Sequence, residues 1–316
     1  MFLTEVPYNS FFFDWEISLE EWLQAALPDG VITAISQFSF LGETTIMLVI
    51  MGILYWGLDK EFGKYVGVNI LVAITFNPLI KNIFIRRRPY FESEGIDLKR
   101  LIEPKADKYD MLAQGYSFPS GHSSGSLTLY GSLACYMKKR WMTVLAIVFP
   151  ILVGFSRVVV GAHYPTDVFV GWIMGIAIIF LVPLLREKAP SDIVFNIILA
   201  VVFAVGFFYC TSDDYFSSYG MLLGFVFADP FEQKFVNFEN TKNPIRVILR
   251  VIGGLGLYEV LNPILKMPFS DEFLNSGTFA AHGVRSLRYA VIIFVIIGIY
   301  PMLFKVTDKL FKKEIA

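Results

Sequence analysis

The chain has 316 residues and a net charge of −1; 55% of its residues are hydrophobic, and only 17% are charged, against roughly 25% in soluble domains. This composition excludes an ordinary soluble domain and indicates a membrane protein. The balanced charge gives no support to a nucleic-acid-binding function.

Residues 1–41 form a first segment that mixes aromatic side chains with acids and contains no Lys or Arg. Its stretch 11–30 predicts an amphipathic helix that lies at the outer membrane interface. The first basic residue of the chain is Lys60, so the positive-inside tendency places the N-terminus on the extracytoplasmic side. Because a basic n-region is missing, no cleavable signal peptide is predicted.

The rest of the chain predicts an all-α polytopic membrane protein, because a span needs about 20 apolar residues of helix. Nine spans are predicted, at 42–58, 62–80, 122–138, 141–157, 165–185, 192–210, 216–229, 244–266 and 284–305. The stretch 216–229 is short, but counting it places the basic tail 305–316 in the cytoplasm, as the positive-inside tendency favours. The predicted organisation is an N-terminal segment 1–41, a core 42–185 and a C-terminal transmembrane extension 186–316.

The first motif, "KNIFIRRRP", follows the second predicted span. If the helix continues, Lys81 and Arg88 are about two turns apart and share a face, while Arg86 and Arg87 point elsewhere. The alternative is that these basic residues only snorkel to lipid headgroups. By the span count this loop faces outward, so a topological signal does not explain its charge.

The second motif, "FPSGHSSGS", opens the third predicted span. Ser120 is a good N-cap, Gly121 allows a close approach, and the free amides of residues 121–123 form a ready anion site. An ordinary loop-to-helix junction would account for Ser120 and Gly121, but not for His122. An ionisable group near hydrocarbon is a functional candidate.

The third motif, "SRVVVGAHYPTD", links the fourth and fifth predicted spans. Arg157 closes one span, and His163 stands just before Pro165, which is favoured at the first position of a helix. Asp167 lies in the first turn, where its carboxylate can accept the imidazole N–H and orient the ring. A His near an Asp at a helix start is, taken alone, more often structural than catalytic.

Together the three motifs place three cations, two histidines and one carboxylate at helix ends on the same predicted side of the membrane. Cations and helix-terminal amides suit the oxygens of a phosphoryl group, whose transfer depends mostly on positioning and charge stabilisation. One histidine can attack phosphorus and the other can protonate the leaving oxygen. The spacing alone does not decide which one attacks.

The combined pattern resembles the three-part signature of the type 2 phosphatidic acid phosphatase (PAP2) superfamily, over roughly residues 42–185. The matching positions are Lys81-x6-Arg88-Pro89, Pro119-Ser120-Gly121-His122 and Ser156-Arg157-x5-His163-x3-Asp167. The resemblance implies a PAP2-type helical bundle and a phosphatase that uses neither metal nor cofactor. It implies that His163 attacks phosphorus to form a phosphohistidine, that Asp167 orients it, and that His122 protonates the leaving group. The phosphate would be held by Lys81, Arg88, Ser120, Gly121, Ser156 and Arg157.

The sequence therefore predicts a membrane phosphatase of the lipid branch, acting on a lipid phosphate or diphosphate at the outer leaflet. Its expected partner is the membrane lipid substrate, and no nucleic acid is expected. Nine spans also resemble the glucose-6-phosphatase layout, so a soluble sugar phosphate is one alternative. A protein that binds or transports phospholipid without cleaving it is another, although binding gives no reason for the His163 and Asp167 pair. The oligomeric state and the role of 186–316 are not predicted.

Overall fold

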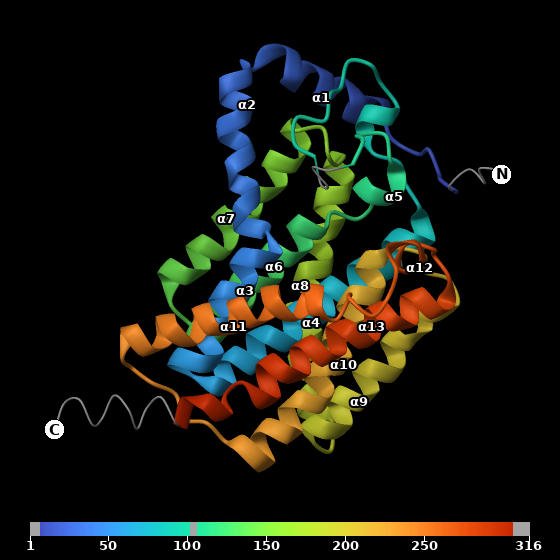
Figure 1. Cartoon of the computed structure of the whole chain (residues 1–316). Coiled ribbons are helices and arrows are strands. Elements are labelled where there is room, and N and C mark those ends of the chain that lie inside the picture. The colour runs from blue at the N-terminus through green and yellow to red at the C-terminus, as the bar shows by residue number, and fades with distance from the viewer. Residues whose placement is uncertain (1–6, 102–105, 306–316) are drawn as a thin grey trace. The chain divides into compact units, whose positions relative to one another are not determined.

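The computed structural model describes residues 7–101 and 106–305. Over these residues the secondary structure is helical, with one isolated β-bridge between Asn9 and Arg86 and no strand. The chain forms two compact units (Figure 1), one made of Met1–Ile46 and Phe76–Val182, the other of Met47–Thr75 and Pro183–Ala316. The predicted all-α architecture is confirmed. The three segments predicted from sequence stay a prediction.

The first unit carries all the motif residues. Its helices α6 and α7 pack side by side, and the short helix η1 packs on α7. Glycines permit the closest approaches, since a Cβ on Gly154 of α7 would lie 2.5 Å from Val168 of α8, and one on Gly171 would lie 2.7 Å from the Ser120 oxygen. The unit contains α1 (Asp14–Ala26), α2 (Asp29–Ser36), η1 (Gln37–Gly42), the end of α4 (Lys60–Phe84), η3 (Pro89–Phe91), α5 (Met111–Gln114), α6 (Gly121–Met137), α7 (Arg140–Val159) and the start of α8 (Pro165–Lys188).

The N-terminal helix α1 turns its acidic face inward. Glu16 and Glu20 are fully buried, whereas Trp15 and Trp22 are 52% and 63% exposed. The expected amphipathic helix therefore exists, shorter than 11–30, with its aromatic side chains outward. Acids on a buried face need cationic or hydrogen-bonding partners, because an ionised carboxylate is costly to remove from water.

The second unit is built around α10, most of whose residues are buried against α9, α13 and η6. A Cβ on Gly220 of α10 would lie 2.2 Å from the Ser286 oxygen of α13, so this contact requires glycine. The unit comprises most of α3 (Thr44–Gly52), η2 (Ile53–Leu58), the start of α4, the end of α8, α9 (Asp192–Phe203), η4 (Ala204–Phe208), α10 (Asp213–Phe231), η5 (Glu232–Val236), α11 (Pro244–Ile264), α12 (Asp271–Leu274), α13 (Phe279–Ile293) and η6 (Phe294–Ile299).

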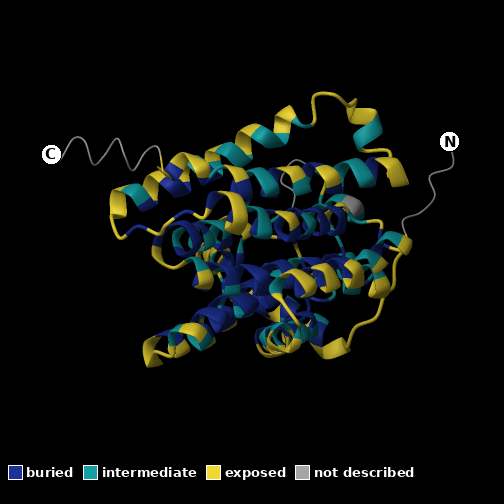
Figure 2. Cartoon of the chain, turned by 90° about the horizontal axis from the view of Figure 1, so that it is seen from below, coloured by how far each residue is buried: buried dark blue, intermediate teal, exposed yellow. Residues whose placement is uncertain are grey.

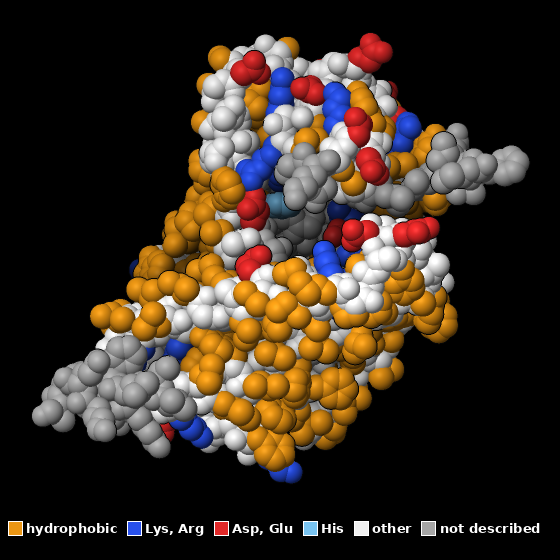
Figure 3. All heavy atoms as spheres, in the orientation of Figure 1, with side chains coloured by type: hydrophobic (Ala, Val, Ile, Leu, Met, Phe, Trp, Pro, Cys, Tyr) orange, Lys and Arg blue, Asp and Glu red, His pale blue; other side chains and the backbone are white. Residues whose placement is uncertain are grey.

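The surface of the helices suits a lipid environment. Buried residues gather on the inner faces of the helices, and exposed ones line their outer sides (Figure 2). In the second unit these outer faces are covered with hydrophobic side chains over α11 and α13 (Figure 3). An outward apolar surface of this kind is typical of a face that contacts lipid or another protein, and the long apolar helices favour lipid.

Nine spans are not confirmed by the described residues. Five helices there are long and apolar enough to cross a membrane, and a bent pair, Asp29–Gly42 with Thr44–Leu58, would make a sixth. The five are α4, α7, α8, α11 and Phe279–Lys305. The predicted spans at 122–138 and 216–229 correspond to α6 and α10, which are largely enclosed by neighbouring helices and so need less hydropathy. Residues 306–316 of the basic tail lie outside the described residues.

Candidate active site

The first motif does not continue as a helix. Helix α4 ends at Phe84, and Ile85 adopts a left-handed backbone with φ of 44°, which is strained for a β-branched residue. Lys81 and Arg88 therefore do not share a helical face, because the helix does not continue to Arg88. They converge instead on one carbonyl, because the Tyr116 oxygen accepts from Lys81 Nζ at 2.6 Å and from Arg88 Nη2 at 3.4 Å.

Arg88 is buried at the junction between this loop and the third motif. Its Nε donates to the Gly115 oxygen at 2.9 Å, and its Nη1 donates to the Ala162 oxygen at 2.6 Å. Nη1 also lies 3.4 Å from Nε2 of His163. The guanidinium is thereby fixed on backbone carbonyls beside one of the two candidate histidines.

Ser120 caps helix α6, as its sequence context predicts. Its Oγ accepts from the Ser123 amide at 3.4 Å and from the Ser123 hydroxyl at 2.9 Å, and the helix begins at Gly121. The Ser120 amide donates to the main-chain carbonyl oxygen of Asp167 at 3.0 Å, which links the second motif to the third. His122, in the first turn, is half-buried and interacts electrostatically with the positive charges of Arg157, Lys81 and Arg88.

Arg157, at the end of α7, is 1% exposed and carries unused donors. Its Nη1 donates to the Ser39 hydroxyl at 3.2 Å, while its Nε and Nη2 have no hydrogen-bond partner among the described residues. The neighbouring Ser156 hydroxyl donates to the Val153 oxygen at 2.7 Å and lies 2.9 Å from the Ser39 hydroxyl. A buried guanidinium with two unpaired N–H groups fits a planar, anionic ligand.

His163 and Asp167 form a buried pair across the start of α8. Nδ1 of His163 lies 3.4 Å from Oδ2 of Asp167, which also accepts from the Tyr164 amide at 2.9 Å and from the Ser117 hydroxyl. With Nδ1 protonated, Nε2 is left with a lone pair on the side of Arg88. Burial, followed by the positive charges of Arg88 and Lys81, lowers the pKa of His163 well below its ordinary value.

The structure thus brings the predicted site residues together in the first unit, and it adds partners that the motifs did not indicate. Ser39 contacts Arg157, and Ser117 contacts Asp167. Arg86, expected to point elsewhere, is buried and its Nη1 lies 2.7 Å from Oδ1 of Asp167. None of these contacts follows from local spacing, because each joins segments far apart in the sequence.

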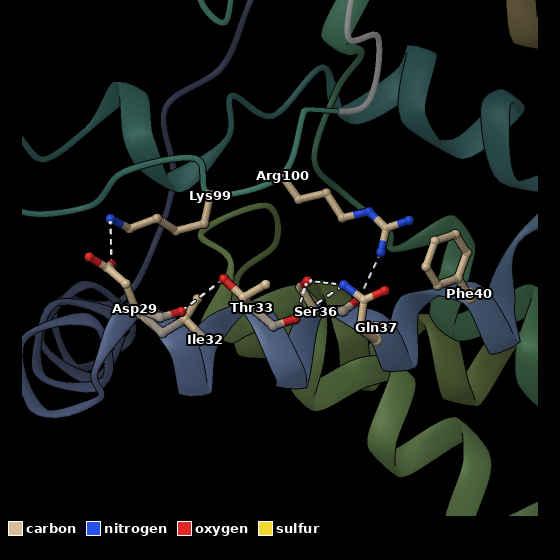
Figure 4. A pocket seen from close by; sticks show the side chains of 8 residues that line it. All are labelled: Asp29, Ile32, Thr33, Ser36, Gln37, Phe40, Lys99 and Arg100. Atoms are coloured by element: carbon tan, nitrogen blue, oxygen red, sulfur yellow. Dashed lines mark hydrogen bonds and ion pairs between the residues drawn. The ribbon is translucent and has the colours of Figure 1, made fainter.

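A separate hollow of about 590 Å³ lies between α2, η1 and the loop at Lys99 and Arg100 (Figure 4). None of the predicted site residues lines it. Its charges are paired within the unit, since Lys99 lies 3.5 Å from Asp29 and Arg100 forms an ion pair with Glu43. The hollow therefore offers no unpaired cation comparable to Arg157.

Comparison with known proteins gives two family matches. Residues 62–191 match the PAP2 superfamily, and residues 216–313 match the PAP2 superfamily phosphatase, transmembrane extension. The first match contains all three motifs, and the second falls within the segment predicted as a C-terminal extension.

Curated relatives with similar sequences are named as lipid phosphatases. An undecaprenyl-diphosphatase of Sulfolobus acidocaldarius is 28% identical over 175 residues, 53% of this chain and 75% of the relative. The undecaprenyl-diphosphatase BcrC of Bacillus subtilis is 29% identical over 48% of this chain and 72% of its own length. Phosphatidylglycerophosphatase B of Bacillus subtilis is 37% identical over 47% of this chain and 71% of its own length. No solved structure matches the chain significantly.

Proposed function

The chain belongs to the PAP2 superfamily, and on that premise we propose that it is an integral-membrane phosphatase that hydrolyses a lipid phosphate or diphosphate through a phosphohistidine, without a metal ion. The observation that carries the proposal is Arg157, whose buried guanidinium leaves Nε and Nη2 without partners in the described chain. A phosphoryl group has the charge and the oxygens to satisfy both donors. Lys81 and Arg88 add positive charge beside the same two histidines.

In the proposed reaction, Nε2 of His163 attacks phosphorus, so a P–N bond forms while the P–O bond to the leaving group breaks. His122 gives its proton to the leaving oxygen. A water molecule then attacks phosphorus and passes a proton to His122, and the P–N bond breaks to release inorganic phosphate. The lowered pKa of His163 supports this role, because a nucleophilic imidazole must be neutral at the working pH.

Asp167 has the geometry of an orienting group in this scheme. Its carboxylate is fully buried and faces Nδ1 of His163, which keeps the lone pair on Nε2. Phosphate would be held by the remaining predicted residues, namely Lys81, Arg88, Ser120, Gly121, Ser156 and Arg157. In the structure the Ser156 hydroxyl donates to the Val153 oxygen, whereas Ser120 Oγ only accepts from Ser123 and keeps its own proton to donate. The amides at the start of α6 are further donors from that region.

A lipid substrate is favoured over a soluble one by the relatives, which are named as undecaprenyl-diphosphatases and a phosphatidylglycerophosphatase. Helix α7 of the site's own unit is long and apolar enough to cross a membrane, which suits a substrate whose tail stays in the bilayer while its headgroup enters the site. An extracytoplasmic site and N-terminus, with a cytoplasmic C-terminus, are supported by the lack of basic residues before Lys60. Labelling of a Glu94→Cys variant by a membrane-impermeant thiol reagent tests this sidedness, and labelling only after lysis would reverse it.

The deciding experiment measures phosphate release by the detergent-purified protein in excess EDTA. Wild type and His163→Ala are compared over lipid monophosphates, lipid diphosphates and glucose 6-phosphate. We expect release from lipids, with a rate that depends on tail length, and none from His163→Ala. His282→Phe is the matched control, because this third histidine stacks on Phe216 with ring centroids 3.9 Å apart and lies outside the motifs.

Three results would contradict the proposal in different ways. Release that stops in EDTA would remove metal independence, and equal rates for glucose 6-phosphate would move the substrate to the soluble class. No release from any compound would favour a protein that binds phospholipid without cleaving it.

A further inference from the structure

The buried acids of α1 meet the catalytic region through one arginine. Oε2 of Glu16 accepts from Arg86 Nη2 at 2.9 Å, and Oε1 accepts from the amide and hydroxyl of Thr166 at 3.0 and 2.7 Å. Thr166 directly precedes Asp167 in the first turn of α8. Glu16 therefore contacts the residue before the proposed orienting carboxylate directly, and it contacts Arg86 as well.

Arg86 lies between two carboxylates. Its Nη2 is bound to Glu16, while its Nη1 donates to Oδ1 of Asp167 at 2.7 Å and to the Thr166 hydroxyl at 2.9 Å. Its Nε donates to the Phe11 oxygen at 2.7 Å, and its guanidinium lies over the Tyr164 ring, 3.8 Å from the centroid. Every nitrogen of Arg86 thus has a protein partner, in contrast to Arg157, so Arg86 is built to hold protein groups and not substrate.

The N-terminal segment is tied to the same place by its backbone. The Asn9 amide donates to the Ile85 oxygen at 2.9 Å, and the Arg87 amide donates to the Asn9 oxygen at 3.0 Å. These bonds flank Arg86 and follow the strained Ile85 turn. The segment that leads into α1 is therefore fixed relative to Arg86, and through it relative to Asp167.

We propose that Glu16 is a positioning residue for the phosphatase reaction, which holds the Arg86 guanidinium against Asp167 so that this carboxylate stays fixed beside His163. The inference rests on the proposed function of the His163 and Asp167 pair. A single guanidinium fork that bridges Glu16 and Asp167 aligns both carboxylates. Without Glu16, the cation keeps only one of its two carboxylate partners, and the orientation of Asp167 is no longer set from the N-terminal helix.

The test compares turnover of a polyprenyl diphosphate in mixed micelles by purified variants. Glu16→Gln removes the charge but keeps the size, and we expect kcat to fall about 10- to 100-fold, as for other outer partners of a functional group, with KM unchanged. Glu16→Asp keeps the charge and should retain an intermediate kcat. Arg86→Lys cannot bridge two carboxylates and should lower kcat at least as far as Glu16→Gln does, to a rate that can still be measured.

Two controls separate positioning from general damage. Arg87→Lys changes the neighbouring arginine, which is partly exposed and paired with Glu92 at 2.8 Å, and should leave kcat unchanged. Inhibition by inorganic phosphate reports on Lys81, Arg88 and Arg157, and its constant should not change in Glu16→Gln. If Glu16 acts through Arg86, the double variant Glu16→Gln with Arg86→Lys should be no slower than Arg86→Lys alone.

The proposal is overturned if Glu16→Gln keeps the wild-type kcat, or if it loses phosphate inhibition together with kcat, which would indicate a purely structural role. Failure of the proposed function has a different signature. An active His163→Ala variant would remove His163 as the nucleophile, whatever Glu16→Gln does.

Discussion

Arg157 combines deep burial with unmet hydrogen-bonding capacity. Its side chain is 1% exposed, and only its Nη1 donates, to Ser39, within the described chain. Buried donors without partners lower stability by about 1–3 kcal/mol. The unpaired N–H groups of Arg157 therefore lower the stability of the unliganded protein, and a bound phosphoryl group would offset this loss.

This cost predicts an opposite effect of one substitution on stability and on activity. Arg157→Met, which is apolar and long enough to fill the space, should raise the melting temperature of the purified protein while abolishing phosphate release. Thermal unfolding and turnover are measured on the same preparation. Inorganic phosphate should raise the melting temperature of wild type but not of the variant. A variant that unfolds earlier than wild type would show that the guanidinium stabilises the unliganded fold.

Helix α1 contains a second buried acid, whose environment differs from that of Glu16. Glu20 is fully buried, and neither of its carboxylate oxygens has a hydrogen-bond partner among the described residues. Burial, together with the negative charges of Asp167 and Glu16, raises the pKa of Glu20 well above its ordinary value, although Arg86 opposes the shift. The folded protein therefore holds Glu20 protonated where the unfolded chain ionises it.

The raised pKa sets the sign of a pH effect on stability. Below the unfolded value of 4.5 both states are protonated, so Glu20 makes no difference. As pH rises above it, the unfolded state is favoured, and stability is lost progressively up to the folded pKa. Glu20→Leu should remove this loss, so its advantage in melting temperature over wild type should grow from pH 5 to pH 8. Asp14→Asn, at an exposed acid of the same helix, is the control, and a constant difference for Glu20→Leu would contradict the assignment.

The sequence predicts contacts between residues close together in the chain, but not contacts between distant segments. The N-cap at Ser120 and the pairing of His163 with Asp167 depend on contacts within four residues, so spacing alone indicates them. The second span was predicted at 62–80, and the condition that its helix continues to Arg88 is not met, because the left-handed turn at Ile85 follows the end of α4 at Phe84. Ser39 beside Arg157 and Glu16 beside Arg86 join segments 118 and 70 residues apart, and no local pattern encodes such contacts.

The two units are interleaved along the chain, so the extension at 186–316 does not form a unit by itself. Residues 47–75 belong to the second unit together with 183–316, not with the segment that carries the motifs. Trp56 packs edge-on against Tyr300 with ring centroids 5.6 Å apart, and a Cβ on Gly254 would lie 2.2 Å from the Trp56 ring. The extension thus completes a core whose other half precedes the first motif.

Buried ion pairs also join the two stretches of chain that form the second unit, residues 47–75 and 183–316. Lys64 is 3% exposed and lies 2.8 Å from Asp229, and Lys60 lies 2.8 Å from the fully buried Glu232. Each pair joins the start of α4 to the end of α10 or to η5. Removing one partner from a buried pair costs about 3–5 kcal/mol, because the other charge stays buried and uncompensated.

A protein cut between α8 and α9 tests whether the extension is a separate addition. Fragment 1–188, expressed alone, retains Trp56, Lys60 and Lys64 without their partners, so we expect it not to be recovered as a folded, monodisperse species after detergent extraction. Co-expression with fragment 189–316 should restore both a single elution peak and phosphate release, since the cut leaves every packing partner present. The measurement is size-exclusion chromatography with turnover across the peak. A monodisperse and active fragment 1–188 would mean that 47–75 can pack without the extension, and that the second unit has no part in holding α4 in place.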